Sequence, residues 1–252
     1  MFALSNELLL LLFFALGSYI QATTGFAFGL IVMSSVSALG LAPIEVTAFA
    51  VSVLSLFNST LGLRGGHLRQ VNRLAFSGIM LTCVPVTFIG VWLLGYLGDT
   101  ELGLLKTLLG LSIVLSSLLM MLQTSRERQR SSATMFGLGG LVAGLMGGMF
   151  GTFGPPLAYL MYRQPDTLAT IRATLLAIFS ITSVVRIAMV MNTQTVSEAT
   201  WFICLIGVPV VALSTVAASR FPLPIKPETM RRFAFALLLV AGTSLAWQGL
   251  AW

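Results

Sequence analysis

Residues 147–156 read GGMFGTFGPP and lie in the middle of an apolar run that extends from Ser131 to Tyr162. A second glycine-rich stretch, TTGFAFG at residues 23–29, lies within another apolar run, Leu8–Ile44. Neither run contains a charged residue, and their lengths are 32 and 37 residues. As straight helices they would be about 48 and 55 Å long, whereas the hydrocarbon core of a bilayer is ~30 Å thick. Each run is therefore predicted to turn within the membrane at its glycine-rich stretch.

The composition is that of a polytopic membrane protein, with 57% hydrophobic and 9% charged residues among 252. A net charge of +6 is also typical of nucleic-acid binders. Here, however, the basic residues lie in short connections between apolar runs, as the positive-inside rule requires. No nucleic-acid partner is therefore predicted. Cys83 and Cys204 lie in separate apolar segments and are expected to pack as small hydrophobic side chains.

The other apolar runs mostly have lengths suited to single crossings, so we predict an all-α fold built from two inverted repeats. Each repeat is a broken-helix hairpin followed by three transmembrane helices. The first repeat covers residues 1–124, with its hairpin at 8–42 and spans at 46–63, 74–98 and 102–123. A cytoplasmic linker at 125–132 follows. The second repeat covers residues 133–252, with its hairpin at 134–162 and spans at 168–191, 199–219 and 229–250.

The two halves also share weak matches that recur in the same order. Matched residues are Phe28-Gly29 with Phe153-Gly154, Thr47, Ala50 and Ser55 with Thr174, Ala177 and Thr182, Pro85 with Pro209, and Lys106 with Arg232. No single match is specific, but their order is what an internal duplication leaves.

Loop charges support the inversion. Basic residues gather in the connections around 64–73, 126–130 and 220–232, whereas the connections 95–101 and 192–198 contain no Lys or Arg. If each long run crossed the membrane once, the connection 220–232 would lie on the opposite side from 126–130. If each is a hairpin, all basic connections lie inside, as the positive-inside rule favours, and both chain ends lie outside.

The glycine-rich stretches are the predicted binding site. Non-helical backbone at membrane depth persists only inside protein or beside a wet cavity, and the half-helix after a break presents free N–H groups that suit an anion. The predicted site residues from these stretches are Gln21, Thr23, Thr24, Gly25, Gly29, Gly151, Thr152, Gly154 and Pro155. Close helix packing is the alternative use of such glycines, and we expect it for Gly140 and Gly144.

Ionisable and amide groups within the apolar runs are further candidates. Arg186 either binds the anion or extends its side chain to the outer interface, and both interpretations stay open at this point. Asn58 occupies the place next to Arg186 in the repeat alignment and is predicted to line the site. Arg172 and Lys106 lie near the ends of their spans, where extension to the interface is expected.

The sequence contains one histidine, no Cys-x-x-Cys and no phosphate-binding Gly-x-x-x-x-Gly-Lys loop. We therefore predict that the protein is not an enzyme and uses no cofactor or metal. Without a nucleotide site, secondary transport by alternating access or passive conduction remains, with a non-transporting accessory subunit as a third alternative. The predicted partners are a small anionic substrate and the lipid bilayer, and a homodimer is left open.

The stretches QATTGFAFGL (21–30) and GLMGGMFGTFGPPL (144–157) resemble the duplicated signatures of the sulfite exporter TauE/SafE family. The similarity in segment order covers essentially the whole chain. It implies a bacterial inner-membrane permease for sulfur-containing anions, such as sulfite or organosulfonates, or for related organic anions. The first signature lacks the proline that usually follows its glycines. We therefore expect the first break to be milder, or its second half-helix to start differently.

Overall fold

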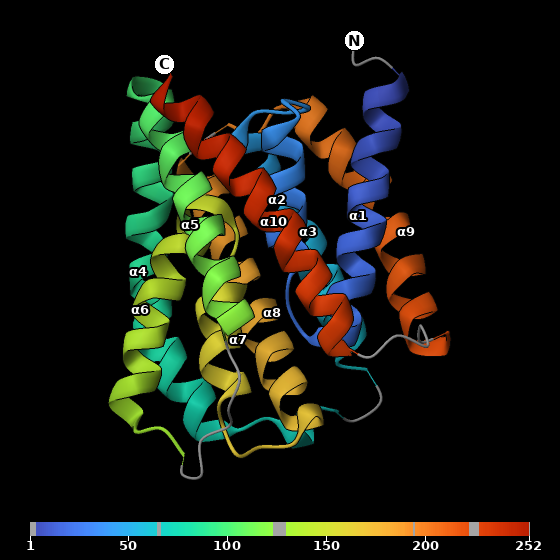
Figure 1. Cartoon of the computed structure of the whole chain (residues 1–252), viewed down its shortest axis with the longest axis vertical. Helices are drawn as coiled ribbons and strands as arrows, with labels where there is room; N and C mark the ends of the chain where they lie inside the picture. Colours follow the sequence, from blue (N-terminus) through green and yellow to red (C-terminus); the bar gives the residue numbers. More distant parts are fainter. Residues whose placement is uncertain (1–3, 65–66, 123–129, 194, 222–226, 252) are drawn as a thin grey trace.

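The computed structural model describes residues 4–64, 67–122, 130–193, 195–221 and 227–251. These residues form ten α-helices and a short 3-10 helix, η1 (Figure 1). In chain order they are α1 (Leu4–Thr24), α2 (Phe28–Ala38), α3 (Ile44–Gly62), η1 (His67–Gln70), α4 (Arg73–Thr100), α5 (Leu102–Leu122), α6 (Ala133–Phe150), α7 (Gly154–Tyr162), α8 (Leu168–Thr193), α9 (Glu198–Arg220) and α10 (Pro227–Leu250). No strand occurs in these residues, and the predicted all-α membrane fold is confirmed.

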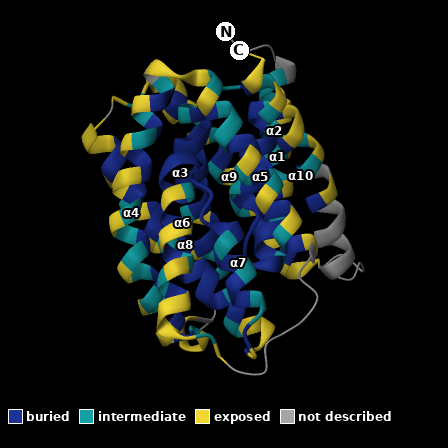
Figure 2. Ribbon diagram, turned by 60° about the vertical axis from the view of Figure 1, so that its left-hand side comes forward, coloured by how far each residue is buried: buried dark blue, intermediate teal, exposed yellow. Residues whose placement is uncertain are grey.

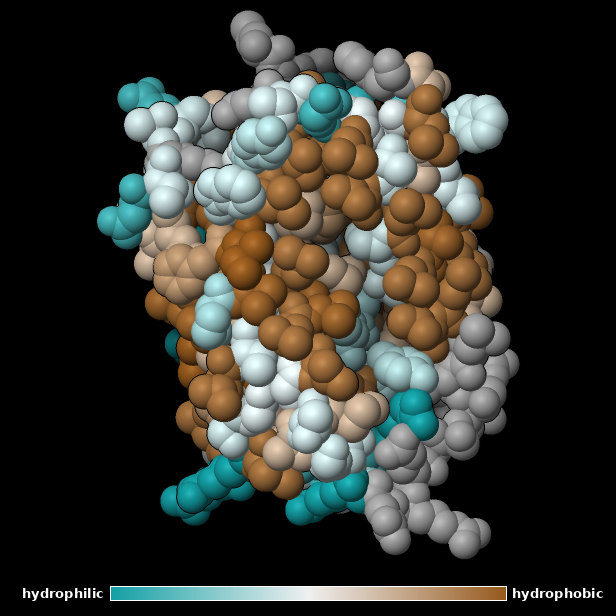
Figure 3. Space-filling view, turned by 90° about the vertical axis from the view of Figure 1, so that its left-hand side faces the viewer, coloured by the Kyte–Doolittle hydropathy of each residue, from teal (hydrophilic) through white to brown (hydrophobic). Residues whose placement is uncertain are grey.

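Seven of the described helices are long and apolar enough to cross a membrane: α1, α3, α4, α5, α6, α8 and α9. Their outward-facing side chains include many large hydrophobic residues, such as Leu81 and Leu205, which are 78% and 71% exposed. Figure 3 shows the result on one face, where a broad hydrophobic band separates hydrophilic residues at the two ends. Exposing so much apolar surface to water is unfavourable in free energy, so this band fits a lipid environment.

Two helices form the centre of the bundle. In the most apolar 18-residue segment of each span, 67% of the residues of α3 and 61% of those of α8 are buried inside the molecule. The corresponding share in the other spans is 33–44%. Figure 2 shows the same contrast, with buried residues in the middle and exposed residues on the outer helix faces. Side chains of α3 and α8 are therefore the ones best placed to contact both breaks.

Both long apolar runs fold as hairpins of two helices, and the two hairpins enter from opposite ends of the molecule. In Figure 1, α1 begins and α2 connects to α3 at the upper end. By contrast, α6 begins and α7 connects to α8 at the lower end, where η1 also lies. The last turn of α10 returns to the upper end, where α1 begins.

The helices pack in four main pairs: α4 with α6, α1 with α9, α5 with α10, and α3 with α8. In chain order, α1 to α5 correspond to α6 to α10. Exchanging each helix for its counterpart converts the pair α4 with α6 into the pair α9 with α1, and the reverse. The same exchange leaves the last two pairs unchanged.

Small residues on α6 bring it close to α4. A Cβ atom on Gly144 would lie 2.5 Å from the Cys83 carbonyl oxygen, and one on Gly140 would lie 2.5 Å from the Ile79 carbonyl oxygen. Only glycine permits this approach, so the packing interpretation of Gly140 and Gly144 is confirmed.

Side-chain caps fix where several helices begin. Asn72 Oδ1 accepts from the Ala75 N–H at 3.1 Å, and Ser197 Oγ accepts from the Thr200 N–H at 3.3 Å. Each bond satisfies one of the N–H groups that a helix leaves without an internal acceptor. In α7 the first turn instead carries prolines, which have no N–H to satisfy.

Candidate functional site

The two helix breaks are equally long but are built differently. The first covers Gly25–Ala27 and the second Gly151–Phe153. Gly25 and Gly151 adopt positive φ angles of 85° and 69°, which glycine accepts without the steric cost of a Cβ. Ala27 also has a positive φ, of 91°, a conformation that is costly for a residue with a side chain.

The expected milder first break is therefore wrong, whereas a different start of its second half-helix is what the structure shows. The N-cap of α2 is the left-handed Ala27, and the Phe28 N–H is 3.3 Å from Gln21 Oε1. The N-cap of α7 is the right-handed Phe153, followed by prolines in the first turn. A glutamine side chain thus caps the half-helix that lacks a proline.

The backbones of the two breaks touch, although they are more than 100 residues apart in sequence. A Cβ atom added to Gly29 would lie 3.1 Å from the Gly151 carbonyl oxygen and 3.2 Å from Thr152 Cγ2. One added to Gly154 would lie 3.5 Å from Phe26 Cβ. The absence of side chains at these glycines is what lets the two hairpins meet.

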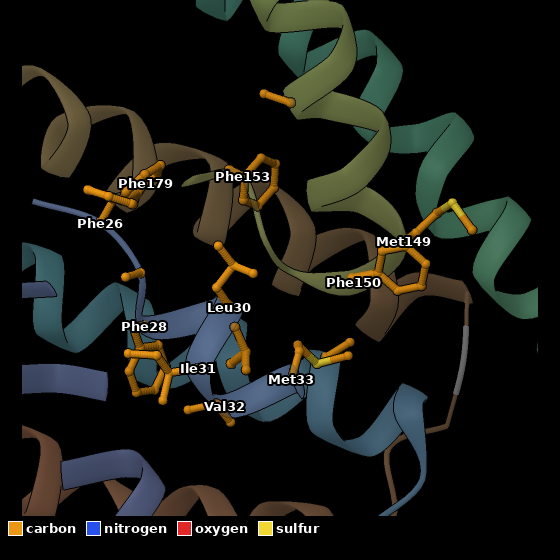
Figure 4. Close-up of a cluster of buried hydrophobic side chains, with 14 of the residues drawn as sticks. Phe26, Phe28, Leu30, Ile31, Val32, Met33, Met149, Phe150, Phe153 and Phe179 are labelled. Carbon is orange, nitrogen blue, oxygen red and sulfur yellow. The ribbon is translucent and has the colours of Figure 1, made fainter. Parts of the chain in front are cut away.

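A small cavity lies at this junction. Its lining residues come from both breaks, from the half-helices beside them and from the central helices α3 and α8: Gln21, Ala27, Gly29, Leu30, Ser55, Gly151, Thr152, Phe153, Gly154, Pro155 and Phe179. The centre of a water-sized sphere can occupy about 10 Å³ of it, which is room for about one water molecule. In Figure 4, Leu30 on α2 faces Phe153 of the second break, and Phe26 lies beside Phe179.

Several hydrogen-bond donors around the cavity have no protein acceptor in the described part of the chain. They are the N–H groups of Gly29 and Leu30 at the start of α2, and those of Thr152 and Gly154 at the second break. The hydroxyls of Ser55 and Thr152 likewise have no partner among the described residues. Such a donor-rich lining between two helix N-termini suits an anion with several oxygen atoms.

Arg186 does not extend to the outer interface, because its side chain is completely buried. Its Nε donates to the Gly148 carbonyl at 2.9 Å, and its NH1 donates to the Ala48 carbonyl at 2.9 Å and to Ser52 Oγ at 2.8 Å. Arg186 is also not among the residues that line the cavity. The guanidinium therefore lies behind the second break and holds its backbone.

The charge of Arg186 still acts on the cavity. No described carboxylate forms an ion pair with it. Two of its acceptors, the Ala48 carbonyl and Ser52 Oγ, lie 3.0 and 3.4 Å from the position of a Cβ on Gly151. The guanidinium is thus separated from the lining residue Gly151 by its own hydrogen-bond acceptors, and in a low-dielectric interior a positive charge without a paired carboxylate attracts an anion.

Besides Arg186, four of the predicted site residues do not line the cavity: Thr23, Thr24, Gly25 and Asn58. The threonine hydroxyls donate to backbone carbonyls nearby, for example that of Ile20 at 2.9 and 2.7 Å. Asn58 Nδ2 instead donates to the Ser18 carbonyl at 3.1 Å and to Thr215 Oγ1 at 3.0 Å. The two Asn58 bonds join α3 to α1 and α9.

Sequence reasoning missed some of the lining. Ser55 lies on α3, 26 residues beyond Gly29, and its only signal was the match with Thr182 in the repeat alignment. Leu30, Phe153 and Phe179 supply the apolar side of the cavity. Two of these three directly follow or lie within a glycine-rich stretch, but apolar residues in a membrane protein carry no sequence signal of their own.

The lining residues carry no negatively charged group. The residues that line the cavity include no carboxylate, histidine or cysteine. Elsewhere in the described residues no group of three or more His, Cys, Asp or Glu side chains gathers closely enough to bind a metal ion.

The family model described as "Sulfite exporter TauE/SafE" matches residues 9–245, which is nearly the whole chain. The chain belongs to this family. Within it, the chain is 38% identical to the "Probable sulfite/organosulfonate exporter TauE" of Cupriavidus necator, over 91% of this chain and 89% of that protein. It is 30% identical to the "Probable inner membrane transporter protein TsaS" of Comamonas testosteroni, over 73% of this chain and 76% of that protein. No solved structure matches the chain significantly.

Membership in the TauE/SafE family identifies the chain as a multi-pass membrane transporter and not an enzyme. The predicted family is thereby confirmed.

Proposed function

We propose that this TauE/SafE protein is a secondary transporter for a small sulfur-containing anion, with sulfite or an organosulfonate as the substrate. The observation that carries the proposal is the cavity at which the two breaks meet, since unpaired N–H groups from both hairpins surround it. The names of two relatives, a sulfite/organosulfonate exporter and an inner membrane transporter, support the same substrate class and an inner-membrane location.

The chemistry of the lining fits such an anion on both of its sides. Sulfite and sulfonate groups present three oxygen acceptors, and the lining residues Gly29, Thr152 and Ser55 supply donors from α2, the second break and α3. The Arg186 guanidinium adds a positive charge behind Gly151. The apolar side chains of Leu30 and Phe179 offer a surface for the carbon part of an organosulfonate.

The size of the cavity favours a transporter over a channel. A site with room for about one water molecule cannot hold a sulfonate until the hairpins separate. A channel in its conducting state would instead have a pore at the junction wide enough for the anion. We propose that the halves are inverted repeats that rock about the junction and expose it to each side in turn. The opposite entry of the hairpins and the exchange of packing pairs support this proposal (Figure 1).

Counterflow in proteoliposomes tests the proposal. Vesicles loaded with unlabelled sulfite and diluted into radiolabelled sulfite should accumulate label transiently and saturably. A channel would give an unsaturated flux without overshoot, and an accessory subunit would give no flux at all. Isothermal titration of the purified protein with sulfite, sulfate, taurine and acetate ranks the substrate classes. Tighter binding of acetate than of both sulfite and taurine would contradict the sulfur assignment.

A further inference from the structure

The helix α8 carries two arginines that bind the same place in each broken helix. Before the first break, the Gly25 N–H bonds to the Gln21 carbonyl at 2.7 Å, and before the second, the Gly151 N–H bonds to the Gly147 carbonyl at 2.8 Å. The next carbonyl in each half-helix is left without a backbone donor. Those two carbonyls belong to Ala22 and Gly148.

Each of these two carbonyls accepts a hydrogen bond from α8. Arg172 NH2 donates to the Ala22 carbonyl, and Arg186 Nε donates to the Gly148 carbonyl at 2.9 Å. Ala22 and Gly148 each stand three residues before the glycine that ends the half-helix, so the two bonds are equivalent. A cation at a helix C-terminus also opposes the negative end of the helix dipole.

The spacing of the two arginines explains why one helix can serve both breaks. They are 14 residues apart, which is about 21 Å along a helix and close to four full turns. Both side chains therefore leave α8 on nearly the same face. The Cα of Arg172 also lies 3.0 Å from the position of a Cβ on Gly25, so the first break packs directly on α8.

We infer that Arg172 and Arg186 are positioning residues, through which α8 holds both breaks in the geometry that forms the anion site. This inference rests on the proposed function for the identity of the ligand, but not for the role of the arginines. Arg186 already uses Nε and NH1 on Gly148, Ala48 and Ser52, so it shapes the cavity without touching the anion. The expectation that Arg172 extends to the membrane interface is thereby replaced by a role inside the protein.

Hydrogen–deuterium exchange on the full-length protein in detergent tests the role without any ligand. Arg186→Gln should speed exchange roughly tenfold or more at the amides of 147–151, because the charge-assisted bonds to the Gly148 and Met149 carbonyls are lost. Arg172→Gln should do the same at 21–25. Thr82→Val is the matched control, since it removes a 2.7 Å bond to the α6 carbonyl of Gly137, far from the break. It should leave both segments unchanged.

Titration with sulfite then separates a positioning role from a ligand role. A positioning role predicts faster exchange in the unliganded variant together with a sulfite Kd raised about tenfold, and a partial return of both in Arg186→Lys. A raised Kd with unchanged exchange would mean that Arg186 acts on the anion directly, by contact or by its charge, and would overturn the inference. Exchange that rises equally in α5 and α10 would reduce the arginines to general stabilisers and overturn it as well.

The double variant Arg172→Gln with Arg186→Gln tests whether α8 links the breaks. If the two arginines act independently, the fold-changes in Kd of the single variants should multiply in the double variant. If α8 holds both, losing one arginine already displaces it, and the double variant should bind sulfite markedly tighter than the product of the single effects predicts. Multiplying effects would limit each arginine to its own break. If the wild-type protein binds none of the anions, the proposed function fails while the exchange measurements still decide the inference.

Discussion

The hydroxyls of Ser55 and Thr152 are the two side-chain donors that line the cavity without a partner among the described residues. Ser55→Ala and Thr152→Val should each raise the Kd for sulfite about fivefold, because a neutral hydrogen bond contributes ~1 kcal/mol. Isothermal titration measures the change. Thr182→Val is the control, since its hydroxyl donates to the Ile178 carbonyl at 2.8 Å and does not face the cavity. Equal Kd values for all three variants and the wild type would place the anion elsewhere.

The site residues predicted from the sequence fall into those that line the cavity and those that do not, and the position of each residue relative to the helix break explains the difference. Six of the predicted residues line the cavity: Gln21, Gly29, Gly151, Thr152, Gly154 and Pro155. Thr23 and Thr24 are equally close in sequence, but they belong to the last turn of α1. Both hydroxyls therefore bond to the Ile20 carbonyl of α1, and that of Thr24 also bonds to the Phe26 carbonyl of the break. Arg186 was ambiguous because a sequence gives the depth of a charge and not the direction of its side chain.

Individual elements meet at the breaks only where glycine leaves room, and Gly29 on α2 is the closest approach. Gly29→Ala would place a Cβ 3.1 Å from the Gly151 carbonyl oxygen and should separate the two hairpins by a few tenths of an ångström. Counterflow should fall by roughly tenfold or more, since a small displacement at a binding site has large effects. Gly137→Ala on α6 is the control, because its nearest neighbour would be 3.6 Å away. Wild-type counterflow in Gly29→Ala would show that the contact between the breaks is not needed for transport.

A polar cluster joins α4, α6 and the connection between α7 and α8. Asp166 is buried and accepts from Asn72 Nδ2 at 2.7 Å and from Arg130 NH2 at 2.9 Å. Asp166→Ala should lower the Tm by about 4–8 °C, because the buried Asn72 amide loses its partner at a cost of ~2 kcal/mol. Arg130 is 59% exposed and adds little to this. Glu101→Ala, at an exposed position, should leave the Tm unchanged. A similarly small effect for Asp166→Ala would mean that water replaces the lost contacts.

The positions of the helices could be predicted from the sequence, whereas the contacts between helices could not. The apolar runs and their glycine-rich interruptions indicate the helices and the breaks, because a bilayer fixes the length of a crossing helix. Pairing does not follow from those lengths. The contact between α4 and α6 depends on Gly90, Gly144 and their neighbours meeting backbone to backbone, and many other pairs of apolar faces are equally compatible with the composition.

At the scale of the whole molecule, η1 and the start of α6 lie at one end, and the first turn of α1 and the last turn of α10 lie at the other (Figure 1). The lower end in Figure 1 carries η1 and the connection before α8, and basic loops are retained inside the cell. The upper end carries the last turn of α4 and the first turn of α9. We therefore propose that the upper end, with both chain termini, faces the periplasm.

Single cysteines at exposed positions decide the orientation. Both native cysteines are buried, which keeps their background reaction low. Thr100→Cys and Glu198→Cys should react with a membrane-impermeant maleimide in intact cells, whereas Arg69→Cys and Arg220→Cys should react only after the membrane is opened. Arg69 and Arg220 belong to different halves, so their agreement is a condition that only hairpins entering from opposite sides can meet. Labelling of Arg220→Cys but not Arg69→Cys from outside would put the two halves in the same orientation, and a rocking motion of inverted halves would then have no structural basis.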